Sequence, residues 1–346
     1  MPMPADIHRR LDSAEIYIRL AERMVSRRWA SDADPSAPLV TREEALEIAD
    51  LPPSAHLAVL NLGGMARELF LTRPGFRCGI INAKSGRCPE NCAFCAQSRS
   101  YRTSAPVYPM ADAQKLLEGA RKLEEAGAAR YGIVTSGRGP SNRDVEDLEK
   151  AAAEIAAQTR IGLCASLGIL SRERAERLRR AGFTSYHHNL ETGRTFFPKI
   201  CSTHPYDLDV ETVRVAKEAG FRVCSGGLFG LGESWADRIE LAFELSDLKV
   251  DSIPVNFLIP IPGTPLENRP LLEPMEALRI VALMRLVHPT KDIIICGGRA
   301  KILGESWQSW VYAAGANAVM TGDYLTQKGN AFEKDRALVE ALGAEG

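Results

Sequence analysis

The chain has 346 residues, of which 45% are hydrophobic and 25% are charged. This composition is that of a folded globular protein able to bury a full core, and it excludes intrinsic disorder as the default. The formal net charge of −1 leaves no global positive field to attract nucleic acid or an anionic membrane. Small-molecule chemistry is therefore the favoured class of function.

The amino-terminal residues carry charges where a secretory signal needs an apolar stretch. Nowhere does an apolar run approach the roughly 18 residues of a membrane span, and the segment 255–261 is interrupted and flanked by prolines. We therefore expect a cytoplasmic protein that contacts no membrane. In that compartment the eight cysteines are expected as metal ligands, reactive thiols or buried residues rather than disulfides.

Helical periodicity comes first along the chain. Residues 11–29 and 54–73 repeat apolar positions at helical spacing, and Thr41 with Glu44 resembles a capping box that opens a short helix. We expect residues 1–74 to form a helical N-terminal extension and residues 75–346 to form the main domain.

From residue 76 onward, short apolar or β-branched runs alternate with amphipathic stretches, as in repeated βα units. Gly127, Gly182 and Gly220 stand where helix C-caps belong. Eight such units predict an α/β fold of the (β/α)8 TIM-barrel type, because an open doubly wound sheet rarely needs so many. Functional groups should then gather at the C-terminal ends of the strands. The eight strand candidates are 77–83, 130–136, 160–166, 184–191, 222–230, 252–259, 292–298 and 316–322.

The segment SGRCPENCAFCAQS follows the first strand and places Cys88, Cys92 and Cys95 in a C-x3-C-x2-C loop. Three thiolates can hold three irons of a [4Fe–4S] cluster and leave the fourth iron open. S-adenosylmethionine (SAM) can bind that open iron and be cleaved reductively to a 5′-deoxyadenosyl radical. A zinc site, the main alternative, usually needs a second cysteine pair that this loop does not offer.

Four segments together resemble the biotin synthase family of radical SAM enzymes: INAKSGRCPENCAFCAQS, YHHNLET, VCSGGLFGLGE and SIPVNFLIPIPGTPLE. The resemblance runs from about Phe76 to the C-terminus. It implies insertion of one sulfur atom into two C–H bonds of dethiobiotin, with two SAM molecules consumed. It also implies a reducing partner such as flavodoxin or ferredoxin, and we expect a homodimer. A radical SAM enzyme of altered reaction, such as a metallocofactor maturase or one that rearranges a small substrate, and a plain electron carrier remain alternatives.

Cys164 and Cys224 lie on the third and fifth predicted strands, and side chains from alternate barrel strands can meet at one object. Both match positions that ligate an auxiliary iron–sulfur cluster in the family, and Arg299 matches its unusual arginine ligand. The family's third auxiliary cysteine corresponds here to Gly132, which has no side chain to bind iron. Cys296 offers a replacement thiolate, so the cluster is expected as [2Fe–2S] or a variant. Cys296 and Arg299 could both face inward only if the intervening glycines bend the chain.

A second departure concerns SAM. The family carries an arginine for the SAM carboxylate at the position of Asp209, and an aspartate would repel that carboxylate. By the same resemblance, residues in three segments of the chain correspond to SAM and substrate contacts. His187 and His188 are expected as structural residues, and Cys78 and Cys201 have no assigned role. The expected cofactor and substrate contacts are Thr135, Ser136, Gly137, Asn189, Glu191 and Asn256.

Overall fold

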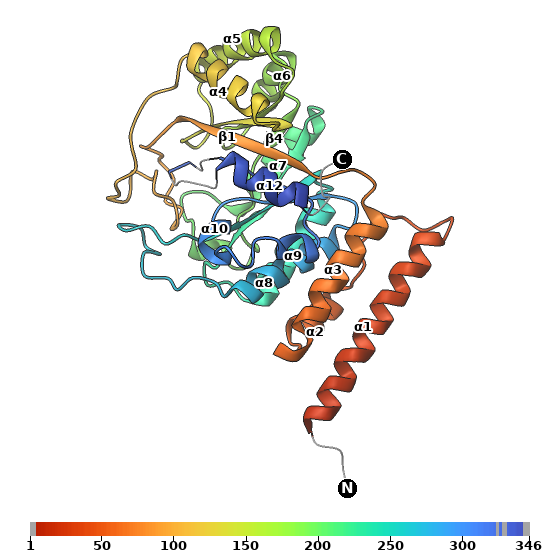
Figure 1. Cartoon of the computed structure of the whole chain (residues 1–346). Helices are drawn as coiled ribbons and strands as arrows, with labels where there is room; N and C mark the ends of the chain where they lie inside the picture. Colours follow the sequence, from red (N-terminus) through yellow and green to blue (C-terminus); the bar gives the residue numbers. More distant parts are fainter. Residues whose placement is uncertain (1–4, 323–324, 327–330, 342–346) are drawn as a thin grey trace.

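The computed structural model describes residues 5–322, 325–326 and 331–341 (Figure 1). Its strands form one parallel sheet in the order β5-β4-β3-β2-β1-β9-β8-β7-β6, and a further pairing of β5 with β7 closes the sheet into a barrel. The predicted (β/α)8 barrel is therefore confirmed. The strands are β1 (Phe76–Lys84), β2 (Arg130–Thr135), β3 (Gly162–Ser166), β4 (Ser185–His187), β5 (Arg222–Cys224), β6 (Gly227–Phe229), β7 (Ser252–Phe257), β8 (Asp292–Ile295) and β9 (Ala318–Met320).

The fifth predicted strand is divided into β5 and β6. Both parts pair with β7 in one continuous register, Cys224 with Ser252 and Gly227 with Val255. The interruption faces Pro254, which has no backbone N–H to donate. The barrel thus keeps eight strand positions although nine strands are assigned.

Helices follow each barrel strand and cover its outer face, as the alternating pattern predicts. Gly127, Gly182 and Gly220 all have positive φ at helix ends, which confirms them as C-cap glycines. Within the described part of the chain, no helix combines the length and apolar character needed to cross a membrane. These helices are α4 (Ala113–Glu125), α5 (Asn142–Gln158), α6 (Arg172–Arg180), α7 (Tyr206–Glu218), α8 (Trp235–Asp247), α9 (Pro274–Val287), α10 (Arg299–Leu303), α11 (Trp310–Ala313) and α12 (Phe332–Ala341), with the 3-10 helix η2 (Phe197–Lys199) before α7.

The N-terminal residues form α1 (Ala5–Trp29), α2 (Arg42–Ala49), the 3-10 helix η1 (Pro53–Ala55) and α3 (His56–Phe70). The capping box of Thr41 and Glu44 is present at the start of α2. Figure 1 shows α1 beside α3, and α3 packs on α9 of the barrel. Leu20, Leu60 and Val281 belong to one continuous buried core. The helical character of the extension is confirmed, whereas its separation at residue 74 as a domain stays a prediction.

Candidate functional site

A cavity of about 470 Å³ runs from the C-terminal mouth of the barrel into its interior. Every site residue predicted from the sequence lines this cavity except Arg299. The residues that line it are Cys88, Cys92, Cys95, Thr135, Ser136, Gly137, Cys164, Asn189, Glu191, Cys224, Asn256 and Cys296.

The loop after β1 holds the first three cysteines at the mouth. Backbone bonds close it on itself, since the Cys88 N–H donates to the Gln97 carbonyl and the Cys95 N–H donates to the Cys92 carbonyl. Gly86 and Arg87 turn the chain with positive φ just before the first cysteine. Burial raises the pKa of Cys95 to about 11, so this thiol keeps its proton at neutral pH until a metal ion replaces it. Three soft sulfur donors on one rigid loop fit an iron–sulfur cluster.

Four further thiols lie deeper in the barrel, three of them on its first, third and fifth strand positions and one directly after the seventh. They belong to Cys78, Cys164, Cys224 and Cys296. Burial raises the pKa of Cys78 to about 12 and that of Cys224 to about 11. In Cys78 the proximity of Cys224 adds to the shift, and Cys78 and Cys224 together add to that of Cys296. Cys78, Cys224 and Cys296 belong to one packed cluster of side chains, and all four thiols line the same cavity.

Cys78 is one of the residues that the sequence reasoning missed. Its signal was available, because side chains that share a barrel layer come from alternate strands, and Cys78 is on strand one. The rule that linked Cys164 to Cys224 extends to Cys78 without further assumptions. Ile294, Ala318 and Met320 pack with Cys78, Cys224 and Cys296, and Arg130 lines the same cavity.

Neither Gly132 nor Arg299 can supply the auxiliary-cluster ligand that the family resemblance implies at its position. A Cβ on Gly132 would lie 2.9 Å from Cγ2 of Ile80, so the Ile80 side chain occupies the space of a third auxiliary cysteine. Gly298, with φ of 80°, starts α10 and turns Arg299 away from the cavity. The Arg299 guanidinium is fully buried and lies 2.7 Å from Oδ1 of Asp335 on α12. Of Cys296 and Arg299, only Cys296 lines the cavity.

Asn189, Glu191 and Asn256 share the cavity, although β4 ends at His187 and the first two lie in the segment after it. Asn189 donates to the Glu191 carboxylate at 3.3 Å and accepts from the Gly226 N–H at 3.2 Å. Glu191 has a φ of 66° and is therefore held by its neighbours in a strained conformation. Burial, reinforced by the charge of Asp209, raises the pKa of Glu191 to about 8. The side chain is neutral and able to donate a hydrogen bond at pH 7.

Thr135 ends β2, Ser136 and Gly137 follow it, and Ser136 contacts the start of the cluster loop. The Ser136 N–H donates to the Lys84 carbonyl at 2.9 Å, and its hydroxyl donates to the Gly86 carbonyl at 2.8 Å. Gly137 has a φ of 132°, which only glycine adopts easily. The end of β2 is thus fastened to the loop that carries the three cysteines.

Asp209 does not present an unpaired charge to the cavity. Its Oδ1 lies 2.8 Å from Nε2 of His188, and its Oδ2 lies 3.2 Å from Nε2 of His204. Although burial opposes it, these bonds lower the pKa of Asp209. The bond to Asp209 is the main reason that the pKa of His204 is raised to about 11. His188 is accordingly part of a charge network, whereas burial lowers the pKa of His187 to about 4 and leaves it neutral.

Cys201 also approaches the cluster loop. Its Sγ lies 3.9 Å from Sγ of Cys92, and as long as Cys92 keeps its proton this contact lowers the pKa of Cys201 to about 3. Cys201 is buried and lies between Cys92 and His204. Sequence spacing did not indicate this contact, because the two cysteines are 109 positions apart.

Comparisons with known proteins agree with this arrangement. Residues 83–245 match the family model "Radical SAM superfamily", and residues 254–345 match "Biotin and Thiamin Synthesis associated domain". The chain is 53% identical over 304 residues to a biotin synthase of Nitratidesulfovibrio vulgaris strain DP4, covering 88% of this chain and 84% of the relative. It is 48% identical over 311 residues to a biotin synthase of Oleidesulfovibrio alaskensis, covering 90% and 95%.

Two solved structures share the fold. A methylornithine synthase aligns with a TM-score of 0.77 at 20% identity, covering 94% of this chain and 96% of that one. The FeFe-hydrogenase maturase of Carboxydothermus hydrogenoformans aligns with a TM-score of 0.77 at 16% identity, covering 97% and 80%. At these identities the two structures support the barrel alone. With its cysteine loop, its barrel and these relatives, the chain belongs to the biotin synthase family of radical SAM enzymes.

Proposed function

We propose that this chain converts dethiobiotin to biotin. A SAM-binding [4Fe–4S] cluster lies at the mouth of the barrel in this proposal, and a sulfur-donating cluster lies deeper in its interior. One observation carries the proposal: a single cavity joins the three-cysteine loop to four thiols deeper in the barrel, and polar side chains line the same cavity. A plain electron carrier needs no such cavity, and a maturase shares only the fold at low identity.

Cys88, Cys92 and Cys95 are assigned to the [4Fe–4S] cluster, which when bound supplies the electron that cleaves SAM. The hydrogen bonds that close the loop orient the three thiolates and keep the loop against the barrel. Thr135, Ser136 and Gly137 offer backbone groups beside that loop for the methionine part of SAM.

Cys164, Cys224 and Cys296 are assigned to the auxiliary cluster, and Cys78 joins them as a fourth ligand. The donor set is soft and apolar side chains pack beside Cys78, Cys224 and Cys296, which suits an iron–sulfur group. Four thiolates without a guanidinium ligand favour a composition that differs from a [2Fe–2S] cluster with one arginine. Arg299 serves the fold instead, through Asp335.

Asn189, Glu191 and Asn256 are assigned to SAM and substrate. Dethiobiotin has a ureido group with both donors and acceptors, and a protonated Glu191 donates where a carboxylate would only accept. The Asn256 amide is held in place, since its Oδ1 accepts from the Gly297 N–H at 3.0 Å and its Nδ2 donates to the Gly227 carbonyl at 3.3 Å. Oriented amides bind a planar polar group with little loss of conformational entropy.

The remaining assignments concern the surroundings of the enzyme. We place it in the cytoplasm, where all eight cysteines stay reduced. Flavodoxin or ferredoxin serves as the electron donor, the active form is a homodimer, and residues 1–74 act as a helical extension of the barrel domain of residues 75–346.

The test is anaerobic turnover of reconstituted protein with SAM, dethiobiotin and a reductant, with biotin and 5′-deoxyadenosine quantified by mass spectrometry. The parent protein is expected to form both products. Cys164→Ala and Cys296→Ala are expected to form 5′-deoxyadenosine without biotin, because their positions lie away from the mouth loop. If the parent protein consumes SAM and never adds sulfur to dethiobiotin, the proposed reaction is wrong.

A further inference from the structure

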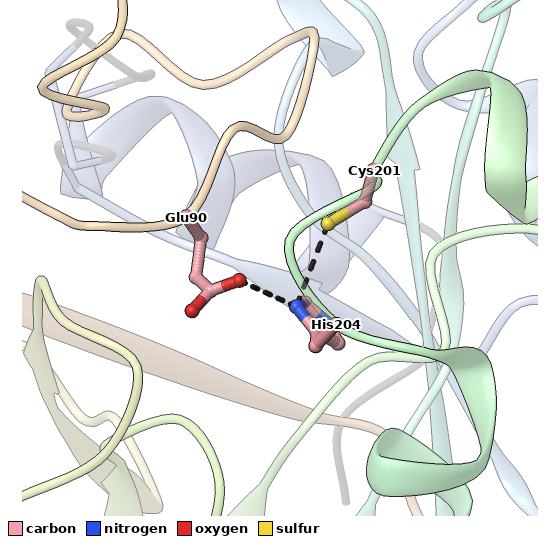
Figure 2. A group of neighbouring side chains, drawn as sticks. All are labelled: Glu90, Cys201 and His204. Carbon is pink, nitrogen blue, oxygen red and sulfur yellow. Dashed lines mark hydrogen bonds and ion pairs between the residues drawn. The ribbon is translucent and has the colours of Figure 1, made fainter.

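A second set of metal-binding side chains lies at the mouth, beside the cluster loop and not used in the function proposed above. Glu90 belongs to the loop itself, and Cys201 and His204 belong to the segment between η2 and α7. One ligand atom from each residue lies within 4.8 Å of the other two. Figure 2 shows the Glu90 carboxylate and the Cys201 thiol approaching the same imidazole. Glu90 and Cys201 are buried, His204 is partly buried, and all three line the cavity.

The distance between the ligand atoms of Cys201 and His204 already suits a tetrahedral metal ion, whereas the distance between those of His204 and Glu90 is too short. Usual zinc–sulfur and zinc–nitrogen bond lengths place the two ligand atoms about 3.6 Å apart at a tetrahedral angle. Sγ of Cys201 lies 3.5 Å from Nδ1 of His204. Nδ1 lies 2.6 Å from Oε2 of Glu90, an ion-pair distance that has to widen to about 3.4 Å when a metal ion replaces the proton. Rotation of the Glu90 side chain supplies that change and breaks the hydrogen bond that its Oε2 accepts from the Thr203 hydroxyl.

The second ring nitrogen of His204 already has the partner that a metal-bound histidine requires. Nε2 lies 3.2 Å from Oδ2 of Asp209, whose other oxygen lies 2.8 Å from His188. A histidine ligand almost always donates its other N–H to such a carboxylate, which fixes the tautomer and orients the ring. Asp209 therefore directs the Nδ1 lone pair toward Cys201 and Glu90. This gives Asp209 a positioning role.

We propose that Glu90, Cys201 and His204 bind one divalent transition-metal ion, zinc by the chemistry of the ligands, in addition to the iron of the clusters. One thiolate, one imidazole and one carboxylate form a mixed set that suits Zn²⁺. The fourth coordination position points to the cavity that the three side chains line, and water or the carboxylate of a small ligand fills it there. The ion also joins the cluster loop to the segment before α7.

The experiment measures zinc and iron together in protein that has been reconstituted anaerobically, loaded with Zn²⁺ and desalted. The parent protein should retain about one zinc per chain, and its zinc K-edge absorption should show one sulfur and two or three lighter ligands. Cys201→Ser and His204→Gln should lose most of the zinc while keeping the iron of the parent. His187→Gln is the matched control, because His187 is a partly buried histidine that lines the same cavity outside the set, and this variant should keep both metals.

Two results overturn the proposal. Retention of far less than one zinc per chain by the parent protein means that no site exists. A zinc spectrum with three or four sulfur ligands means that the ion occupies the Cys88, Cys92 and Cys95 loop instead. Should the variants misfold, anomalous diffraction on parent crystals above and below the zinc edge decides between the two places. Neither measurement depends on biotin formation, so its outcome is separate from that of the proposed reaction.

Discussion

Replacing Cys78 and Arg299 separately should change two different properties of the protein. In the Arg299→Met variant, the Asp335 carboxylate loses a guanidinium that lies 2.7 Å away, in a place where both side chains are fully buried. Removing one partner of a buried ion pair costs about 3–5 kcal/mol. At about 2 °C per kcal/mol for a large domain, Tm should fall by roughly 6–10 °C. The auxiliary iron should remain.

The Cys78→Ala variant should behave in the opposite way. It removes one sulfur atom from a largely apolar environment, which costs about 1 kcal/mol in the metal-free protein. Loss of a ligand should remove the auxiliary iron and biotin formation, while SAM cleavage continues because the mouth loop is intact.

The assay combines iron and sulfide analysis, Mössbauer spectra and thermal unfolding of the cluster-free proteins. Arg299→Met combined with Asp335→Leu is the control, because removal of both charges should recover much of the lost stability. The reasoning is refuted if Arg299→Met loses auxiliary iron at an unchanged Tm, or if Cys78→Ala keeps the iron and forms biotin at the parent rate.

Three further outcomes are expected. Cys88→Ala, Cys92→Ala or Cys95→Ala should abolish 5′-deoxyadenosine formation, and cleavage at the parent rate by all three would remove the mouth-cluster assignment. The folded protein binds a proton on Glu191 up to about pH 8, whereas the unfolded chain releases it near the ordinary pKa of 4.5. The free energy of unfolding should therefore fall as the pH rises between these values, by up to about 1.4 kcal/mol per pH unit. Glu191→Gln should flatten that slope in urea titrations of SAM-free protein, and an equal slope in both proteins would contradict the raised pKa. Gly63→Val should lower Tm strongly, because a Cβ there would lie 2.2 Å from a backbone oxygen of the turn after α11, and a Tm close to that of the parent would show that α3 can shift.

Local patterns in the sequence determined the architecture and the main site. The alternation of apolar runs and amphipathic stretches is a local property, so it predicted all eight barrel positions and the helices after them. The spacing of Cys88, Cys92 and Cys95 lies within one loop, and it indicated the cluster chemistry before any fold was known. Similarity spread over several strands then indicated the family.

The tertiary structure decided which distant side chains meet and in which direction they point. Pro254 divided the fifth strand, and Gly298 turned Arg299 toward Asp335 on α12, a contact 36 positions away in sequence. In the sequence alone, Asp209 appeared as a charge that would repel the SAM carboxylate. Its charge is compensated by His188 and His204, which the fold brings to it from two segments. The sequence shows which residues of one strand share a face, because side chains alternate along a strand. Which side chains meet across the barrel depends on strand register and backbone turns that involve the whole chain.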